Sequence, residues 1–414
     1  MSAAIVSIGT ELMRGEIVNT NASWLAERLT ELGLEVLSIE VVADDAARIR
    51  GCLARLSEKH DLIICTGGLG PTTDDITSAC VADLAQAPLV LDAASIAAIE
   101  ERFRRIGRTM NESNKKQAFF PEGATIIENP TGTAPGFWLE HGNARIACFP
   151  GVPRELRPMF DVAIPPLVEY LVSDAPVQRK IKLFGLPESE VNERLAGIEE
   201  QFGVTLGYRA HFPEIEVKVL ARAQQPSQAE ELAERALDEV TERLGSAVYA
   251  RGDVHFVQSL GQLLRERGMT LALAESCTGG LVSQLVTEFS ASEYFLGGFI
   301  TYANTAKVAL LGVDQQTLDQ QGAVSEAVAI QMAEGARTRL GASIALSITG
   351  IAGPTGGTAE KPVGLVHFAV ATSDGVSSQH IVFPRSRDQI RLFAAYVGLT
   401  LVRRVILDGH IATD

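Results

Sequence analysis

Residues 61–75 read DLIICTGGLGPTTDD, an apolar run that ends in closely spaced glycines and a pair of acids. Such a run predicts a buried β-strand, followed by a turn and then a helix. Apolar runs at 3–8 and 34–43 alternate with the helical patterns of 22–32 and 46–59. Strands that alternate with amphipathic helices are typical of a doubly wound α/β sheet, whose ligands lie beyond the carboxyl ends of the strands. The sequence therefore predicts an α/β fold with a ligand site at this glycine turn.

Two further blocks follow this one along the chain. Residues 172–177 include Ser173-Asp174-Ala175-Pro176 and predict a linker. The next block combines helical patterns with a hairpin around Pro213, which indicates a small α+β module, and the α/β alternation then returns up to a long closing helix. We therefore predict two three-layer α/β domains joined by a small module, with boundaries at 1–172, 177–250 and 253–414.

Charge and composition exclude several classes of function. The 414 residues include 36 Lys and Arg against 51 Asp and Glu, a formal charge of −15. Proteins whose main partner is nucleic acid carry a basic domain or stripe, and this chain has none, so we do not expect nucleic acid as a partner. No apolar run suits a membrane span, and the first residues resemble a strand rather than a signal peptide. The five scattered cysteines form no CxxC pair, which indicates reduced thiols and no structural zinc. We expect a cytoplasmic protein.

The glycine turn is the first candidate site. Its glycines are Gly67, Gly68 and Gly70. They would let backbone amides approach a phosphate, and the following helix would favour an anion; the alternative is a tight turn whose helix is capped by Asp74. Asp74 and Asp75 cannot both cap one helix, so the pair suits a hard divalent metal. Glu11 follows the first strand and would project toward the same sheet edge, where Asn19-Thr20-Asn21 offers neutral hydrogen-bonding groups.

Three long motifs in this part of the chain carry a resemblance to a known family. They are GTELMRGEIVNTNASWLAERL at 9–29, GGLGPTTDDIT at 67–77 and NESNKKQAFFPEGATIIENPTGTAPGF at 111–137. Together they resemble the amino-terminal domain of the CinA (competence/damage-inducible) family, which is similar to molybdopterin-binding proteins of the MoaB/MogA type. The resemblance implies a metal-dependent ADP-ribose pyrophosphatase in which Glu11, Asp74 and Asp75 hold a Mg²⁺, Co²⁺ or Mn²⁺ ion. The pocket residues that it implies are Thr10, Asn19, Asn21, Gly67, Gly68, Gly70, Lys116 and Asn129.

The chemistry of a diphosphate is consistent with this implication. A divalent ion would neutralise developing charge and lower the pKa of a water that attacks one phosphorus. Lys116 would pair with a phosphate oxygen; the alternative is an ordinary solvated charge on a helix. The rival hypothesis is a domain that binds a nucleotide or a pterin without cleaving it. Metal-dependent formation of AMP from ADP-ribose separates the two hypotheses.

A second candidate site lies at AESCTGG, residues 274–280, which also follows a strand and opens a helix. A serine at such a turn exposes its hydroxyl near amides that could stabilise an oxyanion. No histidine is obviously available, so the base for Ser276 would be a lysine. Tyr302 and Lys307 follow at a strand-to-helix junction. The alternative interpretation is a serine helix cap and an exposed lysine.

Three further motifs resemble the carboxy-terminal CinA domain, whose stand-alone form is a nicotinamide mononucleotide (NMN) amidohydrolase. They are LALAESCTGGLVSQLVTEFSASEYFLGGFITYANTAKVALLGV at 271–313, GAVSEAVAIQMAEGAR at 322–337 and SITGIAGPTGGTAEKPVGLVHFA at 347–369. The resemblance implies Ser276 as nucleophile, Lys307 and Tyr302 as the proton-handling pair, and no cofactor. The substrate-contacting residues that it implies are Thr349 and Gly350 at the amide, and Arg387, with Arg391 as the alternative, at the ribose phosphate.

The middle module resembles the KH-like domain that links the two halves of full-length CinA proteins. RNA-binding KH domains clamp the backbone with a GXXG loop. Here three residues separate Gly203 from Gly207, one more than in GXXG, so we expect a structural or dimerising role instead. The whole chain is expected to be a bifunctional hydrolase of pyridine nucleotides, acting on ADP-ribose and NMN, and a homodimer by resemblance. The alternatives are a front domain that only binds its ligand, and a non-catalytic partner in competence or DNA damage.

Overall fold

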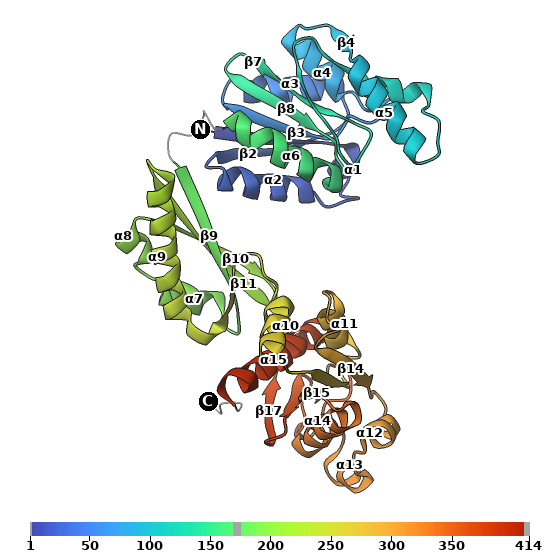
Figure 1. Ribbon diagram of the computed structural model, residues 1–414, viewed down its shortest axis with the longest axis vertical. Coiled ribbons are helices and arrows are strands. Elements are labelled where there is room, and N and C mark those ends of the chain that lie inside the picture. The colour runs from blue at the N-terminus through green and yellow to red at the C-terminus, as the bar shows by residue number, and fades with distance from the viewer. Residues whose placement is uncertain (1, 169–174, 410–414) are drawn as a thin grey trace. The chain divides into compact units, whose positions relative to one another are not determined.

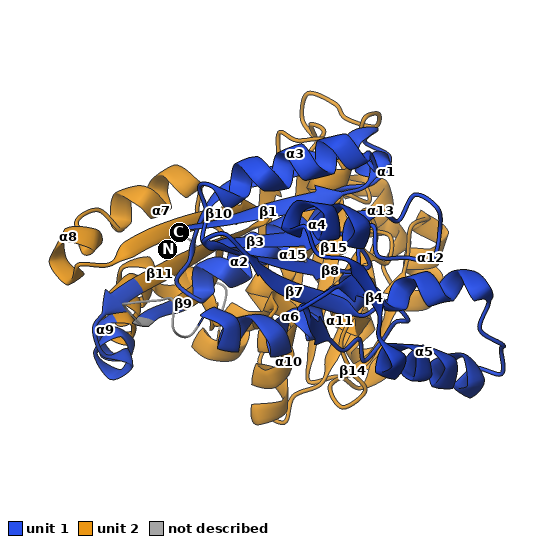
Figure 2. Ribbon diagram, turned by 90° about the horizontal axis from the view of Figure 1, so that it is seen from above, with its two compact units in different colours: residues 1–178, 221–232 blue, residues 179–220, 233–414 orange. Residues whose placement is uncertain are grey.

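The computed structural model describes residues 2–168 and 175–409 (Figure 1). The predicted linker lies in part, at 172–174, outside the described residues. The chain forms two compact units, residues 1–178 with 221–232 and residues 179–220 with 233–414 (Figure 2). No helix within the described ranges is long and apolar enough to cross a membrane.

The first unit is built on a six-stranded sheet with the strand order β2-β1-β3-β8-β7-β6. The strands are β1 (Ser2–Ile8), β2 (Glu35–Val42), β3 (Leu62–Thr66), β6 (Thr125–Ile127), β7 (Gly136–His141) and β8 (Ala144–Phe149). β1 pairs in parallel with β2 and β3, and β3 pairs in parallel with β8. The hairpin of β7 and β8 adds an antiparallel edge. The four parallel strands end at one edge of the sheet, and that edge carries the glycine turn.

Helices cover both faces of this sheet (Figure 1). The helices of this unit are α1 (Thr10–Met13), α2 (Thr20–Glu31), α3 (Ala46–Ser57), α4 (Thr77–Ala85), α5 (Ala93–Arg105), the 3-10 helix η1 (Glu112–Ala118) and α6 (Pro153–Val168), and a small sheet contains β4 (Leu89–Leu91) and β5 (Phe119–Pro121). Ala3 and Ile5 of β1 pack with α2 and α6, whereas Ala4 and Val6 pack with α3 and α4. Successive strand residues point to opposite faces, so both faces are buried in a three-layer arrangement.

The middle module contains an antiparallel sheet with the order β10-β11-β9-β12. Its elements are β9 (Ala175–Phe184), α7 (Glu188–Arg194), α8 (Ile198–Phe202), β10 (Thr205–His211), β11 (Glu214–Ala223), α9 (Pro226–Leu244), η2 (Gly245–Ala247) and β12 (Val248–Arg251). β10 and β11 pair from His211↔Glu214 outward, so the hairpin predicted around Pro213 is confirmed.

The last part of the chain forms a five-stranded sheet with the order β14-β13-β15-β16-β17. Its strands are β13 (Leu271–Glu275), β14 (Phe295–Ile300), β15 (Ile344–Gly350), β16 (Leu365–Ala371) and β17 (Val376–Val382). Its helices are α10 (Phe256–Glu266), α11 (Leu281–Thr287), α12 (Asn304–Leu311), α13 (Gln315–Gln321), α14 (Glu326–Leu340) and α15 (Arg387–Asp408). Leu271 and Leu273 pack with α10 and α15, and Ala272 and Ala274 with α14, so the predicted α/β class is confirmed.

Candidate functional site

A cavity of about 590 Å³ lies beyond the carboxyl ends of β1, β2, β3 and β8. Most of the segments that line it follow one of these strands, which is where ligands bind in α/β sheets. Its lining includes Gly9, Glu11, Asn19, Asn21, Asp44, Thr66, Gly67, Gly68, Gly70, Asp74, Asp75, Gln117, Gly151 and Glu155. Eight of the eleven residues predicted for the first site are among them, namely Glu11, Asn19, Asn21, Gly67, Gly68, Gly70, Asp74 and Asp75.

Packing alone requires glycine at the start of the turn. Gly67 has φ +103°, and a Cβ there would lie 2.1 Å from the Ile8 carbonyl oxygen. Gly68 has φ +67°, and a Cβ there would lie 2.2 Å from the Thr77 hydroxyl. That hydroxyl donates to the Gly67 carbonyl at 2.9 Å and so ties the turn to α4. The tight turn therefore accounts for both glycines without a phosphate, and it still faces the cavity. The cap in that alternative is wrong, because the N-cap of α4 is Ile76, without a side-chain hydrogen bond, and not Asp74.

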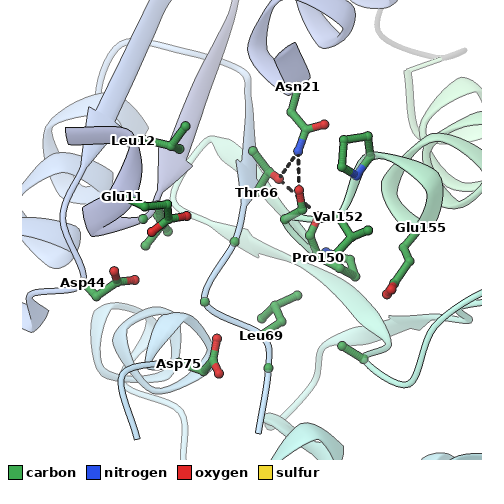
Figure 3. Close-up of a pocket in the computed structure, with 18 of the residues that line it drawn as sticks. Glu11, Leu12, Asn21, Asp44, Thr66, Leu69, Asp75, Pro150, Val152 and Glu155 are labelled. Atoms are coloured by element: carbon green, nitrogen blue, oxygen red, sulfur yellow. Dashed lines mark hydrogen bonds between the residues drawn. The ribbon is translucent and has the colours of Figure 1, made fainter. Parts of the chain in front are cut away.

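Asparagine and threonine side chains join the loops around this cavity (Figure 3). The Asn21 amide donates to the Thr66 hydroxyl at 3.2 Å and to the Gly151 carbonyl at 2.7 Å. The Thr66 hydroxyl in turn donates to the Pro150 carbonyl at 3.1 Å. Asn19 accepts from the Ala22 amide at 3.1 Å and caps α2. Both asparagines therefore line the cavity and also fix its walls.

Carboxylates surround the same cavity, and Figure 3 shows Glu11, Asp44, Asp75 and Glu155 around it. One oxygen of Asp44 accepts both the amide and the hydroxyl of Thr10, at 2.8 and 2.9 Å. One oxygen of Asp75 accepts the amide and the hydroxyl of Thr72, the former at 2.8 Å. These hydrogen bonds fix the orientation of the Asp44 and Asp75 carboxylates.

The acids fit a hard divalent cation by the chemistry of their oxygen donors. The pKa of the exposed Asp74 carboxyl is lowered, chiefly by a hydrogen bond from the Thr72 side chain and further by the Lys116 cation. Within residues 2–168 and 175–409, however, no three His, Cys, Asp or Glu side chains are gathered closely enough to hold a metal. Glu11, Asp74 and Asp75 therefore share a cavity, but they do not form a ready coordination centre.

Three predicted residues lie outside this cavity. Thr10 is bonded to Asp44, as described above. The Lys116 amine donates to the Thr72 carbonyl and lines a neighbouring cavity. The Asn129 amide donates to the Ala134 carbonyl and to Glu155, both at 2.8 Å, so it shapes the loop beside the cavity. Sequence reasoning missed Asp44. It follows β2 as Glu11 follows β1, so a search for acids just after buried strands could have found it.

A second cavity, of about 180 Å³, lies at the carboxyl ends of β13, β14 and β15. Ser276 follows β13, Tyr302 and Lys307 follow β14, and Arg387 is the first residue of α15. The lining contains six of the seven residues predicted for the second site: Ser276, Tyr302, Lys307, Thr349, Gly350 and Arg387.

Lys307 is only 1% exposed, and its amine lies 3.0 Å from the Ser276 hydroxyl oxygen. The amine also donates to the Thr301 carbonyl at 2.7 Å. Burial lowers the pKa of the Lys307 amine, because a poorly solvated site disfavours the ammonium form. Lys307 is therefore not the exposed lysine of the alternative interpretation, and its neutral form can accept a proton from Ser276.

Glu275 is a functional residue that the sequence reasoning passed over. Its carboxylate is 1% exposed and accepts the amides of Gly280, Val282 and Ser283 at 2.8–3.1 Å, and the Ser283 hydroxyl at 2.7 Å. The Ser276 amide donates to the Ile348 carbonyl at 2.9 Å. These bonds fix the turn that carries Ser276, so Glu275 is a positioning residue. The sequence did offer a signal for Glu275, namely an acid at the end of a buried strand and shortly before a helix.

The two arginines occupy different places. Arg387 lines the cavity, and its guanidinium donates to the Gly353 carbonyl at 2.6 Å and to the Tyr302 hydroxyl at 3.4 Å. Arg391 donates to the Thr278 carbonyl at 2.8 Å and so braces the serine turn from outside the cavity. The Tyr302 side chain is 63% exposed. Lys307 therefore contacts Ser276 directly, and Tyr302 faces the mouth of the cavity beside Arg387.

Comparison with known proteins gives matches along the whole chain. Family models described as a probable molybdopterin binding domain, a damage-inducible protein CinA KH domain and a CinA C-terminal domain match residues 4–170, 178–250 and 254–406. A CinA-like protein of Geotalea uraniireducens is 42% identical over 98% of both chains, and one of Geobacter sulfurreducens is 43% identical over 98% of this chain and all of its own. The crystal structure of competence/damage inducible protein CihA from Agrobacterium tumefaciens is 41% identical and covers 35% of this chain and 94% of its own, with a TM-score of 0.34.

Proposed function

The chain belongs to the CinA family, and from this membership and the second cavity we propose that it hydrolyses the carboxamide of NMN to nicotinate mononucleotide and ammonia. One observation carries the proposal: the buried Lys307 amine lies 3.0 Å from the Ser276 hydroxyl. A serine becomes a nucleophile when a base within hydrogen-bond reach takes its proton. A lysine whose pKa is lowered by burial is such a base.

The reaction runs through an ester on Ser276. Neutral Lys307 takes the hydroxyl proton while the serine oxygen bonds to the carboxamide carbon, and the amides of Cys277 and Thr278 in the same turn stabilise the oxyanion. The C–N bond then breaks, and the Lys307 ammonium gives its proton to the leaving nitrogen, which departs as ammonia. Water that has lost a proton to Lys307 attacks the ester carbon. The serine oxygen leaves, recovers that proton and regenerates the enzyme.

The size of the cavity supports a proposal for where each part of the substrate lies. Pockets that enclose a whole drug-sized ligand measure roughly 300–1,000 Å³. The second cavity, at about 180 Å³, instead takes the reacting carboxamide end. The ribose phosphate then lies toward the mouth, where Arg387 stands beside the exposed Tyr302. A planar guanidinium can hold two phosphate oxygens at once, so Arg387 is the proposed phosphate ligand.

Ammonia release from NMN tests this proposal. The wild type and the control Ser290→Ala, which changes an exposed serine after α11, are expected to release ammonia at equal rates. Ser276→Ala is expected to lose about a thousandfold or more, as other enzymes do when their nucleophile is removed. Equal rates for Ser276→Ala and the control would exclude Ser276 as the nucleophile.

The first cavity supports a second candidate function, the hydrolysis of ADP-ribose to AMP and ribose 5-phosphate. Carboxylates and a glycine turn open onto one cavity of about 590 Å³, which suits a diphosphate that carries a divalent ion. Glu11, Asp74 and Asp75 would hold an ion of the Mg²⁺, Co²⁺ or Mn²⁺ class, which neutralises phosphate charge and lowers the pKa of bound water. The chain itself orients the diphosphate on the turn, and Lys116 beside Thr72 supplies a cation.

Chromatography of ADP-ribose incubated with and without divalent metal tests this second function. The wild type is expected to form AMP only when metal is present. Asp74→Asn is expected to lose this activity, whereas Asp83→Asn, an exposed acid of α4 paired with Arg50, should retain it. Binding of ADP-ribose without formation of AMP would favour the rival hypothesis of a domain that binds its ligand without cleaving it.

A further inference from the structure

A cavity of about 450 Å³, here called the base cavity, lies next to the first cavity in the same unit. The two cavities share the wall formed by Gly68, Leu69 and Gly70, together with Asp75 and Gln117. Gln117 is buried, and its amide donates to the Leu69 carbonyl, which braces this wall. A ligand that lies across the glycine turn can therefore reach into both cavities.

The two cavities differ in chemistry. Carboxylates and amides line the first, as described above, whereas the base cavity is mostly apolar. Its apolar lining consists of Leu69, Ile76, Ala79, Leu89, Leu91, Phe119 and Pro135. The charged residues of the lining are two acids, Asp75 and Glu112, and two lysines. Lys115 is paired with Glu112 at 2.9 Å, and Lys116 donates a hydrogen bond to the Thr72 carbonyl. The apolar part of this cavity suits a flat ring, and the lysines beside it suit a phosphate attached to that ring.

The geometry of the short β4–β5 sheet explains how apolar side chains come to line this space. Leu91 pairs with Phe119 across the two strands, so their side chains lie on one face. Leu89 lies on the same face as Leu91, and Val90 between them points the other way. Leu91 is 52% exposed and Val90 is 41% exposed, so both are open to solvent, but only Leu91 lines the base cavity.

We propose that the base cavity binds the planar base of a nucleotide whose phosphates lie on the glycine turn. The base stacks on the Phe119 ring, and Leu91 covers it. Stacking of a base on an aromatic side chain is a general source of nucleotide affinity, and burial of the two leucines adds to it. The inference rests on the proposed diphosphate hydrolysis for its ligand class, and it assigns the nucleotide base and the other sugar phosphate to different cavities.

Calorimetric titration of the full chain with AMP and, separately, with ribose 5-phosphate tests the base cavity. Leu91→Glu is compared with Val90→Glu, which places the same charge on the same strand but outside the cavity. Val90→Glu is expected to bind AMP as the wild type does, and Leu91→Glu about tenfold or more weakly. Ribose 5-phosphate, which has no base, is expected to bind all three proteins equally. Phe119→Leu, which removes the ring and keeps an apolar side chain, serves if Leu91→Glu does not fold.

Three results would overturn the inference. One is equal AMP affinity in the Leu91 and Val90 variants, and another is a loss of both ligands together in Leu91→Glu. The third is a change of oligomeric state in Leu91→Glu with AMP affinity unchanged, which would make the exposed leucines a contact between copies. Turnover of ADP-ribose separates this inference from the proposed function. A wild type that binds AMP through Leu91 but forms no AMP from ADP-ribose refutes the hydrolysis and leaves the base cavity standing.

Discussion

Replacing Lys307 with methionine is expected to remove amide hydrolysis while the carboxy-terminal sheet stays folded. A positioned general base accelerates a reaction by about 10²–10⁴-fold, so kcat for NMN should fall by that factor. The variant also leaves the Thr301 carbonyl without its 2.7 Å partner, a loss of about 1–3 kcal/mol for a buried polar group. Methionine no longer has an amine to desolvate at a site that is 1% exposed, which offsets part of this loss.

The pH dependence of the wild type provides a second readout for the same residue. Burial lowers the pKa of Lys307 in the folded protein below the value of about 10.4 for an unfolded chain. Between these two values the unfolded chain binds more protons, so the contribution of Lys307 to stability rises with pH. The destabilisation is complete below the folded pKa and absent above the unfolded one. The neutral amine is also the active base, so kcat/KM for NMN should rise with pH to a midpoint below 10.4.

Ammonia release measured from about pH 6 to 10 at constant ionic strength checks the loss of activity in Lys307→Met and the rise of kcat/KM with pH in the wild type, since this range lies below the ordinary pKa of a lysine. Lys361→Met is the matched control, because Lys361 also donates to two backbone carbonyls, those of Gln321 and Val324, but does not contact Ser276. The control should keep the activity and the midpoint of the wild type. The reasoning fails if Lys307→Met retains kcat/KM within tenfold of the wild type, or if it preserves the same rising limb with pH.

Three other predictions follow from the contacts described above. Gly67→Ala should lower the free energy of unfolding of the first unit by about 1–3 kcal/mol more than Gly142→Ala, because a Cβ at 67 meets a carbonyl of β1 and one at 142 meets nothing within 4 Å. Urea unfolding followed by tryptophan fluorescence checks this, since both tryptophans lie in that unit, and equal losses would contradict it. Glu275→Gln should weaken the bonds to α11 by about 1.5–3 kcal/mol and speed hydrogen exchange in its first turn; unchanged exchange would remove Glu275 as a positioning residue. Arg387→Met should raise KM for NMN at nearly constant kcat, whereas Arg391→Met should spare KM, and steady-state kinetics with the opposite pattern would reassign the phosphate.

The local pattern of the sequence predicts the α/β class but not the order of the strands. The apolar run of β1 predicts a strand buried on both faces, because a parallel sheet covered by helices needs no polar side. The position of β8 next to β3 depends instead on contacts between residues more than eighty positions apart. The sequence pattern also does not predict the length of α6, because the helix continues through Pro158, Pro165 and Pro166 to Val168. Packing of its apolar face on the sheet overrides the local cost of the prolines.

The candidate sites were predictable where a residue directly follows a buried strand. Glu11 and Ser276 were found in this way, and Asp44 and Glu275 could have been, because Asp44 follows β2 and Glu275 is the last residue of β13. The local pattern does not predict the burial of Lys307, since a lysine in the first turn of a short helix is usually solvated; only the proposed serine–lysine chemistry called for it. Its partner Ser276 lies 31 residues away in the sequence, so only the fold shows that the two side chains are in contact.

The two cavities position their charged side chains by different physical means. Neutral donors orient two acids of the first cavity: Thr10 donates to one oxygen of Asp44, and Thr72 donates to one oxygen of Asp75. A carboxylate oriented through one oxygen keeps the other for a ligand, which suits the cation and the diphosphate proposed for this cavity. In the proposed amide hydrolysis the base of the second cavity acts in its neutral form, and burial lowers the pKa of Lys307 and so favours that form. Glu275 is the nearest buried acid in the sequence. Both of its carboxylate oxygens accept hydrogen bonds from the start of α11, so Glu275 holds the serine turn in place and is not paired with Lys307.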